Sequence, residues 1–403
     1  MKKIASTLLA SGIAVSSLMA ADAAVTAVKV DGSIEKVTYK SNVWKKAKFS
    51  DVTLYPQTTI KMNDKKANEL NADNKAKKAK VGAIHNGKQI AFMIKWPDGT
   101  MNIQSGYKSD SYGDGFAVQL AADYADAAKL PYIGMGSEGR PVIVHLQKAV
   151  KDFYEPNGQG NVYYQMNRNQ TELFEKDLKK FDKKVKSIGS SDYERTFVSE
   201  GFRSMSEIKD ASNSSYARLG YDSKAKGWKG TVSRSLKDSY LDLNAGAVPV
   251  AFAVWDGAKM GRDGLKHLTS WVSVNLEGVN GGDALISGLA AAEGDAANGK
   301  EQAIANCAAC HKLGVAEDMA PDYMAPSLAN IGGYSTSAYL KESMVDPSAV
   351  VVPGYNRNAH KNFAWYNEVD GKRVSTMPAF DWMDEKSMND IIAFMQTLKA
   401  EVE

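Results

Sequence analysis

The chain has 403 residues, of which 44% are hydrophobic, and it carries a formal net charge of +3. This length indicates two or three domains, and the hydrophobic content excludes a wholly disordered protein. Its two cysteines are too few to build a disulfide scaffold.

The N-terminus has the pattern of an export signal. Lys2 and Lys3 precede an apolar stretch over residues 4–19, and small residues follow over 20–24. This order predicts a cleavable signal peptide over residues 1–23. A membrane anchor fits less well, because the apolar run is short and no later segment reaches the roughly 18 apolar residues of a span. We therefore expect a periplasmic protein that does not span the membrane.

Residues 24–283 have the pattern of a β-sandwich domain. Short runs rich in Val, Ile, Tyr and Phe alternate with turns rich in Gly, Asp and Asn, which is typical of two packed antiparallel sheets. Two charged segments are expected on the surface: an amphipathic helix over 171–186 and a loop or short helix over 61–80. Examples of the expected strands are residues 80–85, 89–96, 115–121, 142–146, 193–198, 227–235, 248–255 and 270–276.

Residues 284–290 are expected to link this domain to a second one over 291–403. The second domain is acidic: it contains 9 Lys/Arg and 16 Asp/Glu, a charge of −7, so the remaining chain carries +10. An exported basic body rarely meets nucleic acid, and we expect none as a partner. A face that docks acidic proteins is the better interpretation, although the charge could serve solubility alone.

Both cysteines lie in one motif, Cys307-Ala308-Ala309-Cys310-His311. The spacing C-x-x-C-H is that of covalent haem c attachment, in which two thiols bind the haem vinyl groups and the histidine ligates the iron. A thioredoxin-like pair and a structural disulfide are the alternatives. A thioredoxin motif would follow a strand, whereas this motif ends a predicted helix over 295–306.

The sequence around this motif resembles a class I cytochrome c. The matching pieces are Gly299-Lys300, Ala325-Pro326-Ser327-Leu328, Thr376-Met377-Pro378 and a closing helix over 390–398. The resemblance implies an all-α domain in which His311 and Met377 are the axial iron ligands, and a filled axial pair implies electron transfer. Catalysis at an open iron is the alternative. The rivals of Met377 are Met319, Met324, Met344, Met383, Met388, Met395 and His360.

A second resemblance covers most of residues 85–276. The motifs that carry it include Trp96-Pro97-Asp98-Gly99, Pro131-Tyr132-Ile133-Gly134-Met135-Gly136, and Arg262-Asp263-Gly264-Leu265-Lys266. They look like the haem b-binding γ subunit of ethylbenzene dehydrogenase and its relatives. The family fold is a β-sandwich related to sugar-binding and cytochrome-binding modules, and the resemblance implies haem b ligation by Met135 and Lys266.

These two ligands are chemically reasonable. The glycines on either side of Met135 let a flat porphyrin approach the backbone. Lysine binds iron only as the neutral amine, so burial must lower its pKa from about 10.4. The rivals are His267 and His145 for the lysine and Met101 for the methionine.

The sequence contains no catalytic constellation of its own, such as a nucleophile elbow, a phosphate-binding loop or a zinc cluster. We predict an electron-transfer subunit with one haem b and one haem c. The resemblance implies iron–sulfur and molybdenum partner subunits of the dimethyl sulfoxide reductase class, and a soluble c-type cytochrome at the other end. The alternatives are a sugar-binding sandwich fused to a cytochrome that serves another dehydrogenase, and a purely structural sandwich.

Overall fold

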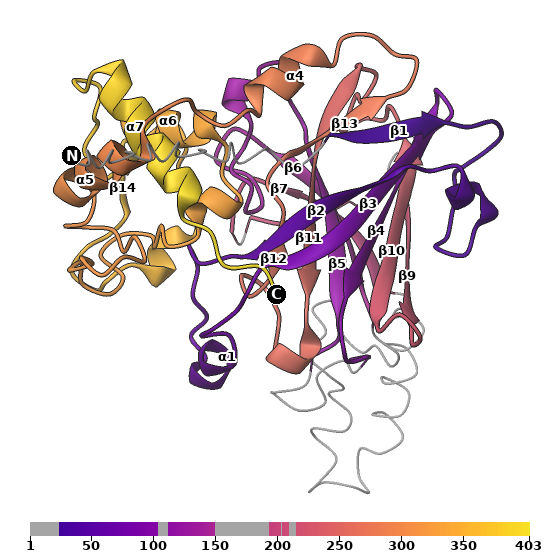
Figure 1. Ribbon diagram of the computed structural model, residues 1–403, viewed down its shortest axis with the longest axis horizontal. Helices are drawn as coiled ribbons and strands as arrows, with labels where there is room; N and C mark the ends of the chain where they lie inside the picture. Colours follow the sequence, from indigo (N-terminus) through magenta and orange to yellow (C-terminus); the bar gives the residue numbers. More distant parts are fainter. Residues whose placement is uncertain (1–23, 104–111, 150–192, 203, 209–214) are drawn as a thin grey trace, which may run out of the picture.

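The computed structural model describes residues 24–103, 112–149, 193–202, 204–208 and 215–403. Its β-rich part and its helical C-terminal part lie side by side (Figure 1). The predicted signal peptide and the predicted helix over 171–186 both lie outside the described residues.

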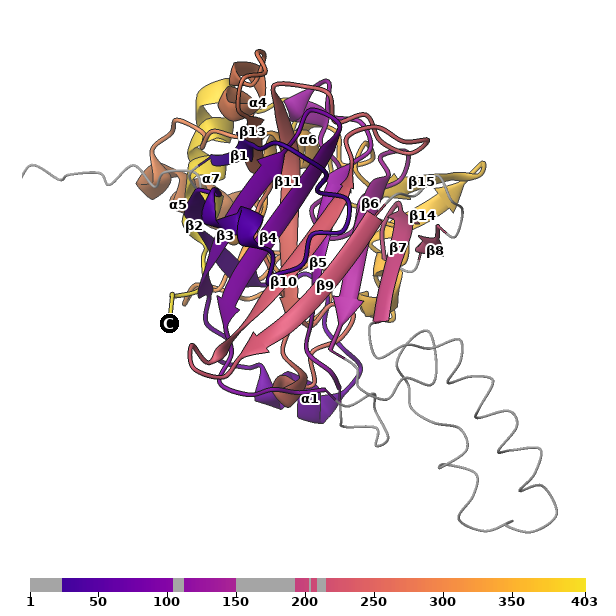
Figure 2. The same cartoon turned by 90° about the vertical axis from the view of Figure 1, so that its right-hand side faces the viewer.

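Thirteen strands of the described chain form a sheet that folds over itself into a sandwich (Figure 2). One layer runs in the order β8-β7-β6-β5-β11, and the other in the order β2-β3-β4-β10-β9. The strands are β1 Val25–Lys29, β2 Phe49–Pro56, β3 Lys77–His85, β4 Gln89–Pro97, β5 Gly115–Ala121, β6 Val142–Lys148, β7 Tyr193–Ser199, β8 Ser206–Glu207, β9 Ser215–Asp222, β10 Gly227–Ser235, β11 Ala247–Trp255, β12 His267–Leu268 and β13 Val272–Leu276.

The two layers are joined along one side. Strand β12 pairs with both β11 and β2, and β1 runs parallel to β13 and β3. Apolar side chains fill the space between the layers; for example, Phe92 of β4 meets Phe252 of β11 with ring centroids 6.3 Å apart. The predicted β-sandwich is therefore confirmed.

Each strand named as an example overlaps an observed one. The two-residue strands β8 and β12 fall outside the named examples, as do three longer strands, β1, β2 and β9. These three segments mix charged residues with their apolar ones, as in Phe49-Ser-Asp-Val-Thr-Leu-Tyr-Pro56. Their strand conformation follows from pairing with neighbours, β2 with β3 and β9 with β10, and such tertiary pairing outweighs weak local propensity. The lysine-rich segment over 61–80 contains a short helix, α1 Lys65–Leu70.

The C-terminal part contains the helices α5 Ala296–Asn306, α6 Ser337–Val345 and α7 Glu385–Thr397. Helices α5 and α7 cross closely at Gly299, where an added Cβ would lie 1.9 Å from the carbonyl oxygen of Asp390. The helical domain is as expected. The chain adds a small hairpin to it, β14 Tyr366–Val369 with β15 Lys372–Ser375.

The two parts are in direct contact. Helix α4 Asp283–Gly288 occupies most of the predicted linker. Arg140 of the β part forms a bidentate pair with Glu342 of α6, with both N–O distances 2.7 Å. The C-terminal Val402 forms a parallel bridge with Ala76. These contacts hold the helical part against the sandwich.

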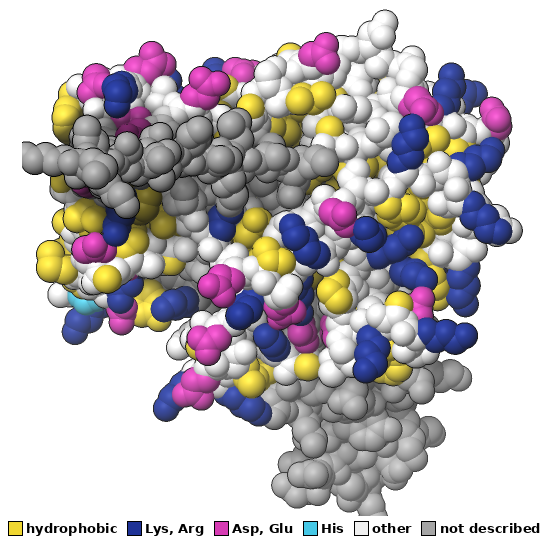
Figure 3. Space-filling model, in the orientation of Figure 1, with side chains coloured by type: hydrophobic (Ala, Val, Ile, Leu, Met, Phe, Trp, Pro, Cys, Tyr) yellow, Lys and Arg dark blue, Asp and Glu magenta, His cyan; other side chains and the backbone are white. Residues whose placement is uncertain are grey.

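The predicted charge difference is visible on the surface. Figure 3 shows mostly basic side chains over the β part of this face and acidic side chains around the helical part. In the part of the chain that the structure describes, no helix has the length and apolar character needed to cross a bilayer.

Candidate functional site

Helix α5 presents the cysteine motif to a cavity. Asp295 caps the helix by accepting from the backbone N–H groups of Ala297 and Asn298. The motif continues as a further turn, because the His311 N–H donates to the carbonyl of Cys307 at 2.9 Å. Both thiols are free and line the same cavity. Burial raises the pKa of Cys307 to about 11, so the free thiol is protonated at neutral pH.

The ring of His311 is oriented by the backbone. Its Nδ1 lies 2.7 Å from the carbonyl oxygen of Pro326. A carbonyl only accepts, so Nδ1 carries the proton and Nε2 keeps its lone pair. Burial also lowers the pKa of His311, which favours the neutral ring that an iron ligand requires.

This first cavity has a volume of about 710 Å³, within the range of cofactor pockets. Its walls are mainly apolar, and they include Leu328, Ile331, Leu340, Met344, Val350, Val352, Phe380 and Met395. The residues present therefore fit a covalent haem: two thiols and an oriented imidazole face an apolar chamber.

Four methionines line this cavity, namely Met324, Met344, Met377 and Met395. The other rivals, Met319, Met383, Met388 and His360, are not among the lining residues. Met377 follows the β14–β15 hairpin, and its N–H donates to the Ser375 hydroxyl at 3.1 Å. The cavity lining thus reduces the candidates for the sixth iron ligand to four methionines, and Met377 remains the predicted one.

A second cavity, of about 450 Å³, lies on the outer face of the sandwich. Met135 and Lys266, which are far apart in the sequence, both line it. Met135 belongs to the loop between η2 Ala127–Lys129 and β6, and Lys266 directly precedes β12. The fold therefore brings together the two residues that the resemblance paired.

The loop that carries Met135 is fixed in an unusual backbone conformation. Met135 has φ +80°, which side-chain-bearing residues rarely adopt. A Cβ on the next residue, Gly136, would lie 2.7 Å from the Ser199 carbonyl oxygen, so only glycine fits there. The loop carbonyls accept side-chain hydrogen bonds from Trp271 to Pro131, from Gln119 to Ile133 and from Ser199 to Met135.

Lys266 is a buried amine that faces the cavity. It is 7% exposed, and burial lowers its pKa to about 8. Among the described residues, no carboxylate pairs with its Nζ, which lies 5.6 Å from the centroid of the Trp255 ring. Burial favours the neutral amine, and the negative charge of Asp263, which lines the same cavity, opposes this in part. The neutral amine is the state in which a lysine can bind a metal.

The floor of the second cavity is made of small side chains. Strands β5 and β11 turn Phe116, Val118, Phe252 and Val254 into the sandwich core. The alternate residues Ala117, Ala251 and Ala253 face the cavity, and Ala117 pairs directly with Ala253. These three alanines leave open space on the two strands, beside the larger Gln119 and Trp255 of the same strands, which line the cavity as well.

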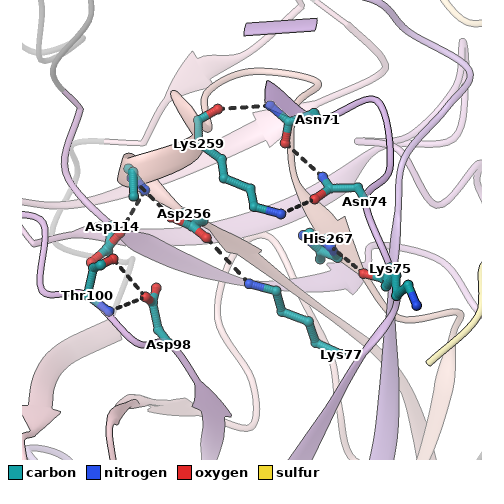
Figure 4. A network of polar contacts seen from close by, with 12 residues as sticks. Asn71, Asn74, Lys75, Lys77, Asp98, Thr100, Asp114, Asp256, Lys259 and His267 are labelled. Atoms are coloured by element: carbon teal, nitrogen blue, oxygen red, sulfur yellow. Dashed lines mark hydrogen bonds and ion pairs between the residues drawn. The ribbon is translucent and has the colours of Figure 1, made fainter. Parts of the chain in front are cut away.

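The rival ligands are held elsewhere. His267 points into a polar network away from the cavity, where its Nε2 lies 3.0 Å from the Lys75 carbonyl oxygen (Figure 4). His145 lies within the sandwich, 3.2 Å from both Thr196 Oγ1 and Arg234 Nη1. Met101 is 52% exposed. None of the three lines the second cavity.

Some lining residues were not predicted from the sequence. Thr59 and Tyr132 come from the β part but line the first cavity, and Arg357 comes from the C-terminal part but lines the second. No local pattern marks such residues, because they reach the sites only through domain docking. Lys148 was also missed, although its alternation with Val144 and Leu146 along β6 indicates the cavity face.

The polar network in Figure 4 also contains three carboxylates, Asp98, Asp114 and Asp256. Asp114 is fully buried, and burial together with the charge of Asp98 raises its pKa to about 7. The carboxylate oxygens accept from protein donors, which are the backbone N–H groups of Thr100, Asn102, Gly257 and Ala258 and the side chains of Thr100, Trp228 and Lys77. These donors hydrogen-bond all three carboxylates within the protein.

Comparison with known proteins matches both parts of the chain. Residues 41–267, more than half of the chain, match the family described as ethylbenzene dehydrogenase, and residues 296–399 match cytochrome c. No curated protein matches the chain significantly.

Among solved structures, the chain is similar to a family 9 carbohydrate binding module from Caldicellulosiruptor kristjanssonii. For the complex with cellotriose the identity is 7%, the TM-score is 0.30, and 64% of this chain and 94% of that chain are covered. For the complex with glucose the values are 8%, 0.29, 64% and 96%.

Proposed function

This chain belongs to the ethylbenzene dehydrogenase family and ends in a cytochrome c domain, and on that premise we propose that it is a periplasmic electron-transfer subunit with one haem b and one haem c. The observation that carries the proposal is that two cavities occur, each lined by the ligands expected for one haem. The chain's role is to hold and insulate redox groups rather than to transform a substrate.

In the first cavity, the residues of this chain would fix haem c at three points. The thiols of Cys307 and Cys310 supply the covalent bonds, and His311 directs Nε2 inward because Pro326 holds Nδ1. Met377 would supply a soft sulfur ligand, which favours ferrous iron. A bound haem iron supplies one-electron chemistry, and the apolar walls exclude water from it.

In the second cavity, Met135 and Lys266 would ligate haem b above the alanine floor. The lowered pKa of Lys266 makes its neutral amine available near neutral pH. Lys148 and Arg357 also line this cavity and would pair with the carboxylates of the haem. The carboxylates of Glu207 and Asp263 line the cavity as well, so the support for haem over a neutral sugar comes from the buried amine and the thioether, which can bind a metal, rather than from a purely cationic lining.

The partners follow from the family and the surface. Iron–sulfur and molybdenum subunits of the dimethyl sulfoxide reductase class would exchange electrons with haem b, and a soluble c-type cytochrome with haem c. Export through the predicted signal peptide over residues 1–23 would place the chain in the periplasm, where haem c is attached.

A reductive titration of the purified two-haem protein tests this function. We expect the chain to take up two electrons, one per haem, and to pass them to a soluble cytochrome c. Because His311 with Met377 and Met135 with Lys266 would leave neither iron open to a further ligand, carbon monoxide should leave the reduced spectrum unchanged. Rapid formation of a carbon monoxide complex would reveal an open iron and would contradict a purely electron-carrying role.

A further inference from the structure

The two cavities share a wall. Tyr132 lines the first cavity, while Ile133 and Met135, in the same loop, line the second. In the C-terminal domain, the turn η5 Tyr355–Asn358 likewise contributes residues to both cavities. Its Tyr355 lines the first cavity and its Arg357 lines the second. Two short segments, one from each domain, therefore separate the cavities.

Tyr132 is the centre of this wall. It is 1% exposed, and its hydroxyl lies 2.7 Å from Thr59 Oγ1. Its ring packs against Tyr339 and Tyr355 of the C-terminal domain, with centroids 5.2 Å and 5.8 Å away. The β domain therefore contributes a buried ring to the cavity that holds the cysteine motif.

The wall is held rigidly. Hydrogen bonds from Trp271, Gln119 and Ser199 fix the loop carbonyls over residues 131–135. Gly201 lies against Pro353, where an added Cβ would be 2.6 Å from the proline Cδ. The loop is therefore fixed within the β domain, and Gly201 of the same domain packs against Pro353 of the cytochrome domain.

The spacing of the loop sets the separation of the two sites. Three peptide units connect Tyr132 to Met135, and an extended chain spans at most about 3.6 Å per residue, so the two Cα atoms are within about 11 Å. Three peptide units therefore connect a residue that lines one cavity to an expected iron ligand in the other.

We infer that residues 132–135 bridge the two haem sites, and that Tyr132 of the β domain is a positioning residue of the haem c site. The inference rests on the proposed function. One electron passes between the irons within a single chain: one iron goes from ferrous to ferric as the other goes from ferric to ferrous, and no proton or ligand moves. The cytochrome domain would then receive electrons while it stays packed against the β domain, rather than by moving on a flexible linker.

Two buried tyrosines provide a matched pair for the test. Tyr334 is fully buried at the same interface and bonds Thr58, as Tyr132 bonds Thr59, but it lines neither cavity. We would compare Tyr132→Leu with Tyr334→Leu, and use Tyr132→Phe to restore the ring without the hydroxyl. Haem b and haem c content is measured first in every protein, which tests the proposed function separately.

The main readout is inter-haem electron transfer after a one-electron reducing pulse. We expect opposite absorbance changes of the two haems, with a first-order rate that does not depend on protein concentration. Tyr132→Leu should slow this phase severalfold and shift the haem c potential, Tyr132→Phe should restore most of the rate, and Tyr334→Leu should change neither. The unfolding midpoint of each variant measures how much the substitution destabilises the fold.

Two results would overturn the inference. In a wild-type protein with both haems, a rate proportional to protein concentration would mean that electrons pass between molecules. Equal slowing by Tyr132→Leu and Tyr334→Leu would mean that the tyrosines only stabilise the interface. If wild type lacks haem b, the proposed function fails instead, and the haem analysis shows this before any kinetics are measured. Should Tyr132→Leu not fold, Tyr132→Phe and the wild-type concentration series still decide the outcome.

Discussion

The two cavities of this protein are built in different ways. In the first, three of the four proposed haem contacts lie within five consecutive residues at the end of α5, Cys307 to His311. In the second, the proposed ligands Met135 and Lys266 come from separate loops and meet only because the sandwich folds. A local sequence motif therefore determines most of the first site, whereas the second site forms only through tertiary structure.

This difference has a chemical basis. A covalent cofactor needs nucleophilic thiols at a fixed spacing, so that a single helical turn provides most of the site. A non-covalent cofactor is held by shape, burial and ligand strength together. The alanine floor, the strained loop at Met135 and the buried amine of Lys266 each contribute. Substitutions should accordingly have local effects in the first cavity and distributed ones in the second.

The largest expected effect is at the cysteine motif. Cys307→Ala removes one of the two thiols and should abolish stable two-point attachment of haem c, while the b-type haem stays in its separate cavity. Haem staining after denaturing electrophoresis measures attachment. An Ala309→Ser substitution inside the same motif is the control and should keep full attachment. Two intact thioethers in Cys307→Ala would contradict the assignment.

Lys266→Ala should remove the b-type spectrum selectively. Removing a residue that only hydrogen-bonds to a metal ligand costs about 10–100-fold in affinity, so the loss of a direct ligand should cost about 100-fold or more. The neighbouring His267→Ala is the matched control, because His267 points into the polar network rather than the cavity. Difference spectra after haem addition give the affinities. A normal b-type spectrum in Lys266→Ala would exclude this lysine as a ligand.

Met377→His should lower the potential of haem c. Axial ligands set haem potentials over about 0.8 V, and exchanging a thioether for an imidazole should shift this one by about 0.1 V or more. Met395→Leu changes another methionine of the same cavity and should have a much smaller effect. Potentiometric titration compares the two. If Met395→Leu shifted the potential and Met377→His did not, the ligand assignment would have to change.

A smaller effect, confined to the sandwich, is expected from its buried carboxylates. Folding raises the pKa of Asp114 from about 3.9 to about 7. Its contribution to stability is therefore complete below pH 4 and is lost as the pH rises through 7. Burial is the larger cause of the raised pKa and the charge of Asp98 the smaller one, so Asp98→Asn should lower that pKa in part and reduce the loss of unfolding free energy between pH 5 and pH 8 by about 1 kcal/mol.

Urea unfolding of both proteins at the two pH values measures this difference. Asp242→Asn is the control, because its ion pair with Lys237 is exposed to solvent and should contribute little to stability. An identical pH dependence in wild type and Asp98→Asn would show that the charge of Asp98 does not raise the pKa of Asp114.

Features that depend on local sequence could be predicted, whereas features that depend on tertiary contacts could not. Strong alternation predicted strands such as β5 and β10 to the residue, whereas β2 was missed because its strand state comes from its neighbours. The cysteine motif marked the first cavity directly. For the second, the ligand pair came from a resemblance, and the structure added that Met135 and Lys266 line one cavity.

Residues that reach a site across the domain interface could not be predicted. Nothing in the local sequence of Tyr132 indicates that its ring faces the cysteine motif, and nothing near Arg357 indicates a role in the other domain. Their positions follow from docking, to which the Arg140–Glu342 pair contributes. Docking depends on the fit of two folded surfaces, which no local periodicity encodes.

The most direct test of the two-haem account is a pyridine haemochrome spectrum of the purified protein, combined with acid–acetone extraction. The protein should be produced in a host that attaches haem c. We predict one covalent haem c that stays with the chain and one haem b that is extracted. A single covalent haem with nothing extractable, even after haem addition, would contradict the account and leave the sandwich as a ligand-binding or structural module.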